Sequence, residues 1–122
     1  MIRIALLDDE NDQREITAAL LERYLSQHPE LSAQVRSFQS GYELLDAVER
    51  SGSFDLYLLD IVMPEQNGIE VGLSIRKLDG LGLIVYLTTS PDYAVDSYLT
   101  NAFHYLLKPV RWEQMVSVLD RA

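Results

Sequence analysis

Five side chains in the sequence are suited to metal and phosphate chemistry, and all of them stand at the ends of short apolar runs. They are Asp8, Asp9, Asp60, Thr88 and Lys108. Carboxylate oxygens bind hard divalent cations, and hydroxyl and ammonium groups bind the oxygens of a phosphoryl group during its transfer. If the fold brings these residues together, we expect a Mg²⁺-assisted site for phosphoryl transfer.

Three carboxylates cannot lie together without a compensating charge. Two unit charges about 5 Å apart repel by roughly 3 kcal/mol at an effective dielectric constant of about 20. Lys108 supplies one positive charge, and a bound Mg²⁺ would supply two. The chain has no cysteine and no histidine beside these acids, so zinc is disfavoured. Asp60 is the carboxylate that we expect to attack phosphorus, because aspartyl phosphates are an established covalent route.

Each acidic segment also has a simpler explanation. A single aspartate at a strand end, such as Asp60, is most often a turn residue or a helix cap. The run Asp8-Asp9-Glu10 on its own is typical of acids that complement a helix macrodipole. These explanations become less favoured because residues suited to metal and phosphate chemistry recur at the ends of four of the apolar runs.

The apolar pattern predicts five strands that alternate with five helices, and the strand at 32–38 has the weakest apolar pattern. The strands cover residues 2–7, 32–38, 54–60, 83–87 and 103–107. The helices cover residues 12–27 and 41–50, a segment that opens at Asn67-Gly68, a short segment after Pro91, and a last segment with the apolar stripe Trp112, Met115, Val116 and Leu119. This alternation indicates an α/β fold, a doubly wound parallel sheet with helices on both faces. Right-handed crossovers then gather the carboxyl ends of the strands at one edge, where ligands bind in such sheets.

Local signals define several element ends. Ser40 and Glu43 have the spacing of a capping box. Ser90 is placed to cap the short fourth helix, and Asn101 is placed to end it in a left-handed conformation. That helix is expected to carry Tyr93, Val95 and Tyr98. Gly68 is expected to supply a backbone conformation that other residues rarely adopt.

Composition bounds the class of protein. With 122 residues, of which 48% are apolar, the sequence is expected to form one globular domain, residues 1–122. The formal charge of −9 argues against direct nucleic-acid binding by this domain. The first apolar run, 2–7, is too short for a secretory signal, and no run has the length of a membrane span. We therefore expect a cytoplasmic protein without a membrane partner.

The motifs together resemble the receiver domain of two-component response regulators over essentially the whole chain. They are Asp8-Asp9, Asp60 with Met63-Pro64 and Gly68, Thr88, Tyr105 and Lys108-Pro109. Residues 103–109 and 92–95 are most similar to receivers that precede LytTR-type DNA-binding domains. The resemblance implies the flavodoxin-like (βα)5 fold with strand order 2-1-3-4-5. It also implies an output domain that is absent from this chain.

The resemblance implies a role for each site residue. Asp60 would be the phosphoacceptor, which takes a phosphoryl group from a phosphohistidine of a sensor histidine kinase. Asp9, Asp60 and the main-chain carbonyl of Val62 would ligate Mg²⁺, and Asp8 would act largely through water. Lys108 would pair with Asp60 at rest and with a phosphoryl oxygen afterwards.

The resemblance also implies a relay and partners. Thr88 would turn toward the phosphoryl group, and Tyr105 would rotate into the space that Thr88 leaves. Receivers commonly form homodimers, or contact their output domain, through the last two helices and the last strand. Val62 cannot orient a water by hydrogen bonding, so we expect slow autodephosphorylation and no other enzymatic turnover.

Two other functions use parts of the same pattern. A haloacid-dehalogenase-type phosphatase also has an aspartate nucleophile and Mg²⁺, but its second acid follows two residues after the nucleophile, whereas this chain has the adjacent pair Asp8-Asp9. A receiver-like interaction module that works without phosphorylation would not need the complete set Asp9, Asp60, Thr88 and Lys108. Both functions stay open on the sequence alone.

Overall fold

The computed structural model describes residues 1–64, 66–94 and 96–122, which form a five-stranded parallel sheet. The strands are β1 Ile2–Leu7, β2 Ala33–Phe38, β3 Leu56–Asp60, β4 Leu83–Thr88 and β5 His104–Leu107. Their order across the sheet is β2-β1-β3-β4-β5. This order confirms the flavodoxin-like fold that the sequence predicts.

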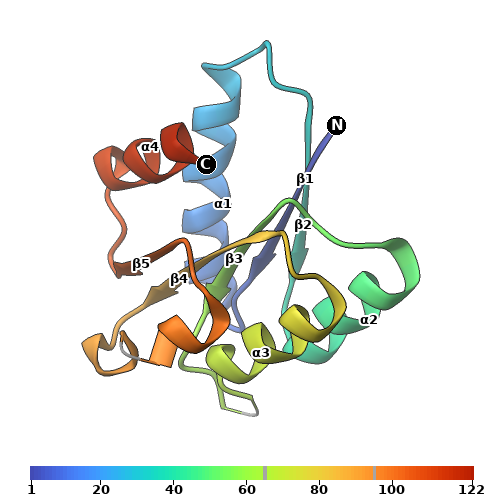
Figure 1. Cartoon of the computed structure of the whole chain (residues 1–122). Helices are drawn as coiled ribbons and strands as arrows, with labels where there is room; N and C mark the ends of the chain where they lie inside the picture. The colour runs from blue at the N-terminus through green and yellow to red at the C-terminus, as the bar shows by residue number, and fades with distance from the viewer. Residues whose placement is uncertain (65, 95) are drawn as a thin grey trace.

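In the described part of the chain, four α-helices and two 3-10 helices connect the strands. They are α1 Asn11–Ser26, α2 Gly41–Ser51, α3 Gly68–Leu78, η1 Pro91–Tyr93, η2 Asp96–Thr100 and α4 Trp112–Arg121. In Figure 1, α1 and α4 cover one face of the sheet, α2, α3 and η2 lie on the other, and η1 lies beyond the end of β4. None of the helices in the described residues has both the length and the apolarity that crossing a bilayer would require.

Side chains of the strands alternate between the two layers. In β1, Ile4 and Leu6 pack in the apolar cluster beneath α1 and α4, whereas Ala5 and Leu7 pack in the cluster beneath α2 and α3. Successive side chains of a strand point to opposite faces, so a strand covered on both sides is apolar throughout. On the central strands β1, β3 and β4 the charged side chains, Arg3 and Asp60, therefore lie near the strand ends, whereas the edge strand β2 carries polar residues along its length.

The connection between β4 and β5 differs from the expected fourth α-helix. It forms η1 and η2, and Val95, which was expected in that helix, lies outside the described residues. Ser97 Oγ donates to the carbonyl of Ala94 at 2.6 Å, and Thr100 Oγ1 donates to the carbonyl of Ser97 at 3.0 Å. Such bonds to carbonyls three residues earlier compete with the α-helical ladder and favour the tighter 3-10 geometry.

The predicted element ends agree with the structure in most details. Ser90 Oγ accepts from the N–H of Asp92 at 3.2 Å where η1 begins. Asn101 has a φ of 53° and ends η2 in the left-handed region. Ser40 Oγ accepts from the N–H of Glu43 at 3.2 Å, but the described hydrogen bonds include no return bond, so half of the capping box is present.

Gly68, the first residue of α3, is required for a different reason from the expected one. Its φ lies outside the left-handed region, so the expectation of a special backbone conformation is wrong. A Cβ at this position would lie 2.0 Å from the carbonyl oxygen of Asp60 and 2.7 Å from Cα of Ile61. The N–H of Gly68 donates to the carbonyl of Ile61 at 2.8 Å. The missing side chain thus lets α3 begin directly against the end of β3.

Replacement of Gly68 by Ala is expected to lower the free energy of unfolding by about 1–3 kcal/mol, because backbone at the end of β3 must shift to admit the methyl group. Urea unfolding measures this loss. Gly80→Ala is the matched control, since nothing lies within 4 Å of a Cβ there, and its effect should stay within about 0.5 kcal/mol. Equal losses for the two variants would contradict the close-approach explanation.

Candidate functional site

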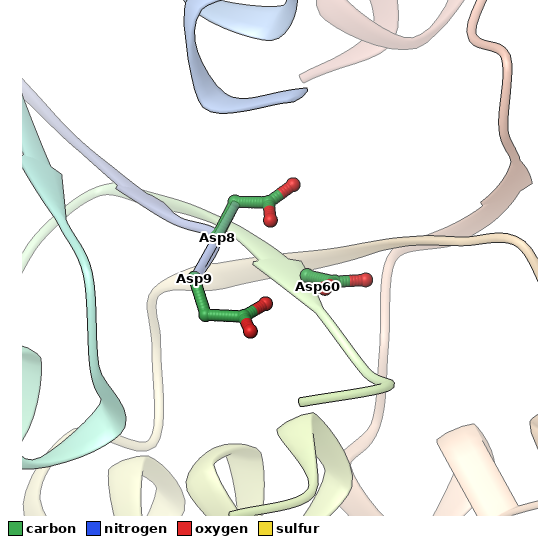
Figure 2. Close-up of side chains that lie close together, drawn as sticks. All are labelled: Asp8, Asp9 and Asp60. Carbon is green, nitrogen blue, oxygen red and sulfur yellow. The ribbon is translucent and has the colours of Figure 1, made fainter. Parts of the chain in front are cut away.

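Three carboxylates meet at the carboxyl edge of the sheet. Asp8 and Asp9 follow β1, and Asp60 is the last residue of β3. The register pairs Leu7 with Leu59, which puts Asp8 and Asp60 side by side on neighbouring strands. Oxygens of the three carboxylates lie within 4.8 Å of one another, and Figure 2 shows the side chains gathered around the end of the central strand. The predicted convergence of these acids is confirmed.

Lys108, which follows β5, places its ammonium group in the cluster. Its Nζ is 2.7 Å from Asp8 Oδ2 and 3.5 Å from Asp60 Oδ1, and all three side chains are largely buried. We expected Lys108 to pair with Asp60, but its shorter contact is with Asp8. Because one ammonium faces three carboxylates, the cluster keeps an excess of negative charge. The peptide bond between Lys108 and Pro109 is cis.

The two acids after β1 differ in their hydrogen-bond partners. Asp8 Oδ1 accepts from the N–H of Glu10 at 3.0 Å, and Asp8 Oδ2 accepts from Lys108. Asp9 Oδ1 is buried and has no partner among the residues that the structure describes. A buried carboxylate oxygen without a partner is costly unless a cation binds it. The all-oxygen cluster with its excess charge therefore fits a hard divalent cation such as Mg²⁺.

Burial is the main reason that the pKa of Asp60 is raised to about 6. The positive charge of Lys108 lowers this pKa, and the negative charges of Asp8 and Asp9 raise it. Without a bound cation, the Asp60 carboxyl group therefore takes up a proton at only mildly acidic pH. A cation in the cluster would favour the ionised form, which is the nucleophilic one.

A cavity of about 270 Å³ opens beside Asp60. It is lined by Glu10, Gln13, Asp60, Val62, Thr89, Lys108 and Pro109. A water occupies about 30 Å³ of liquid, so the cavity has room for a phosphoryl group and several waters. Gln13, in the first turn of α1, was not among the predicted site residues. Its position in the first turn of α1 could have predicted it, because helical side chains point toward the N-terminal end of their helix, which here is the end beside the acids.

The side chains of Thr88 and Tyr105 meet at one residue, Ser90. Thr88 ends β4 and is fully buried, and its Oγ1 accepts from the N–H of Ser90 at 3.2 Å. The hydroxyl of Tyr105 donates to the carbonyl oxygen of Ser90. Tyr105 is half-buried and packs against the apolar cluster beneath α2 and α3. Ser90 therefore connects the side chains of Thr88 and Tyr105, in addition to the direct pairing of β4 with β5.

Comparison with known proteins identifies the family. The response regulator receiver domain model matches residues 4–120. The chain belongs to this family. A receiver domain is a regulatory component of two-component systems, so membership argues against the phosphatase alternative.

Relatives of this receiver include several response regulators. An uncharacterised response regulatory protein of Yersinia pestis is 33% identical over 99% of the chain and 48% of its own length. The sensory transduction protein LytT of Bacillus anthracis is 27% identical over 99% of the chain and 47% of its own length. A crystal structure of the response regulator TrrA from Thermotoga maritima in complex with Mg²⁺-BeF has 29% identity and a TM-score of 0.77, and the match covers 99% of this chain and 98% of that one. The receiver thus spans about half the length of these two sequence relatives.

Mg²⁺ is expected to stabilise the receiver through Asp9. At a Mg²⁺ concentration about 100 times the Kd, binding to the folded state adds roughly 3 kcal/mol to the free energy of unfolding. Asp9→Asn should remove most of this gain, whereas Asp46→Asn, on the exposed face of α2, should keep it. Urea unfolding in Mg²⁺ and in EDTA measures both. Retention of the full gain by Asp9→Asn would contradict the assignment of Asp9.

The raised pKa of Asp60 predicts a pH-dependent effect of Asp60→Asn in EDTA. The pKa of Asp60 is higher in the folded state than in the unfolded state, so the folded state favours the protonated carboxyl group. The free energy of unfolding of the parent therefore falls as the pH rises from about 4 through about 6. At pH 7.5 we expect Asp60→Asn to be more stable than the parent by about 2–3 kcal/mol. Near pH 4 the difference should approach zero. Urea unfolding at the two pH values measures it, and an equal difference at both would refute the burial cost.

Proposed function

We propose that this receiver is the phosphoacceptor switch of a two-component system and that Asp60 is the residue phosphorylated. The observation that carries the proposal is the position of Asp60 at the end of the central strand, beside a cavity of about 270 Å³ and between acids and an ammonium group. The donor would be a phosphohistidine of a sensor histidine kinase. Its N–P bond would break as an O–P bond forms on the Asp60 carboxylate.

Mg²⁺ would be held directly by Asp9, Asp60 and the main-chain carbonyl of Val62, and through water by Asp8. The hydrogen bonds support this division of roles, because both Asp8 oxygens already have partners, whereas Asp9 Oδ1 has none among the described residues. When bound, the cation supplies positive charge that offsets the negative charge of the phosphoryl oxygens during transfer. The structure of the related TrrA in complex with Mg²⁺-BeF is a further support.

Lys108 and Thr88 would stabilise the phosphorylated form. The Lys108 ammonium, now 3.5 Å from Asp60 Oδ1, would bind a phosphoryl oxygen in place of that contact. The Thr88 hydroxyl would donate to another phosphoryl oxygen and withdraw from the N–H of Ser90. Ser90 would then shift together with the carbonyl that Tyr105 binds. Phosphorylation would in this way bias a two-state loop whose position Tyr105 reports.

The surface through which the switch acts on a partner would be the exposed apolar residues of η2 and β5. Tyr98, Leu99 and Leu107 are 83%, 68% and 46% exposed there. Together with α4, these elements would form the homodimer or contact the output domain. Residues 1–122 would correspond to the receiver domain, because the match covers about half the length of the two sequence relatives. The likeness to LytT and the local motifs favour a LytTR-type DNA-binding output domain. DNA contact would fall to that domain, because the charge of −9 makes DNA binding by the receiver itself unfavourable.

Incubation with Mg²⁺ and a small acyl phosphate is expected to add one phosphoryl group to the receiver, which intact mass detects. Asp60→Asn should stay unmodified, because it lacks the nucleophilic carboxylate. Asp46→Asn, exposed on α2, should be modified like the parent. A parent that stays unmodified in excess Mg²⁺ would overturn the proposal and favour an interaction module that works without phosphorylation.

A further inference from the structure

The cavity beside Asp60 is where a phosphoaspartate would be hydrolysed, so its walls determine which side chain can hold the attacking water. Val62 and Pro109 offer no side-chain hydrogen bond. Lys108 already contacts Asp8 and lies near Asp60, where the phosphoryl group would form. The wall residues that remain able to bind a water are Glu10, Gln13 and Thr89.

Gln13 differs from the other two in burial and in charge. Glu10 and Thr89 are exposed, whereas Gln13 is half-buried. The carboxylate of Glu10 would also be repelled by a phosphoryl group, which carries nearly two negative charges. The amide of Gln13 is uncharged and has both donors and an acceptor. It can therefore accept from a water and donate to a phosphoryl oxygen at the same time.

A comparison of α1 with α4 indicates why the Gln13 amide is available. Gln114 occupies the third position of α4, and its Oε1 accepts from the N–H of the N-cap residue Arg111 at 3.0 Å. Gln13 occupies the same position of α1, but the N–H of its N-cap residue Glu10 already donates to Asp8 Oδ1 at 3.0 Å. That contact occupies the donor that a glutamine at the third position ordinarily binds. Because Asp8 accepts from the N–H of Glu10, the Gln13 amide is not needed for capping and can bind a water in the cavity that it lines.

We infer that Gln13 positions the water that hydrolyses phosphorylated Asp60, an inference that rests on the proposed function. The water oxygen forms a bond to phosphorus as the bond between phosphorus and the Asp60 oxygen breaks. The electrons of that bond stay on the Asp60 carboxylate, and both water protons end on the released phosphate. A glutamine side chain orients the attacking water in the same way in other phosphoryl-transfer proteins. Gln13 thereby sets the lifetime of the phosphorylated receiver, a task for which Val62 has no suitable group.

Gln13→Leu tests this role, because it keeps the approximate size of the side chain and removes both hydrogen-bonding groups. The protein is phosphorylated with an acyl phosphate, the donor is removed with Mg²⁺ retained, and intact mass at successive times gives the rate of phosphate loss. We expect loss about tenfold slower than in the parent, the effect of one hydrogen bond of ordinary strength. Uptake of the phosphoryl group should change little. An unchanged rate of loss, or an equal slowing of uptake and loss, would overturn the inference.

Two further variants separate water positioning from a structural effect. Gln114→Leu removes the cap at the same helical position of α4, so it should lower stability and leave the rate of phosphate loss unchanged. Gln13→Leu combined with Val62→Asn should regain faster loss, because an amide returns to another wall of the same cavity. If the double variant loses phosphate no faster than Gln13→Leu alone, a role of Gln13 in positioning the attacking water is contradicted.

The same experiment distinguishes the inference from the proposed function. A parent that takes up no phosphoryl group refutes the proposed function. A parent that is phosphorylated on Asp60 and loses the group at the same rate with Gln13→Leu refutes only the role of Gln13.

Discussion

The structure depends on holding three carboxylates and one ammonium group at the end of an otherwise apolar sheet. Asp60 is only 4% exposed, and this burial raises its pKa. The strands beneath it are fixed by apolar side chains in two packed layers, so the acids cannot move apart without disturbing both. The repulsion is therefore retained in the folded protein. A charge-rich site on a rigid scaffold responds strongly to any cation or phosphoryl group that enters it.

The same rigidity bears on the proposed relay, in which a local change of charge would reach a distant surface. Thr88 and Tyr105 bind opposite sides of the Ser90 peptide backbone, one through its N–H and the other through its carbonyl. β4 and β5 are paired up to Thr88 and Leu107, so these strands cannot slide past one another. In the proposed relay, a displacement at Thr88 would be taken up by the loop at Ser90 and by the ring of Tyr105. The exposed apolar residues of η2 and β5 lie beyond that point.

The connection between β4 and β5 combines a firmly anchored end with short 3-10 helices. Arg76 of α3 donates to the carbonyl of Thr100 at 2.7 Å and to that of Gly82 at 2.6 Å. The hydroxyls of Tyr86 and Thr100 also meet at 2.8 Å in the core. These contacts fix the end of η2 against α3 and β4. The described residues of this connection form the 3-10 helices η1 and η2, whose hydrogen-bond geometry is poorer than that of α-helices. That property suits a segment placed between the acid cluster and the exposed surface.

The sequence by itself determined the alternation of strands and helices and the polar residues at the strand ends, because hydrophobic periodicity and turn chemistry are local properties. The strand order came from the likeness to receivers and agrees with the structure. Only the tertiary structure decided that Lys108 lies closer to Asp8 than to Asp60, that Gly68 is required by a close approach, and that Gln13 lines the cavity. Each of these features depends on distances between segments far apart in the chain. Close packing of the two layers sets those distances, and no local pattern of residues encodes them.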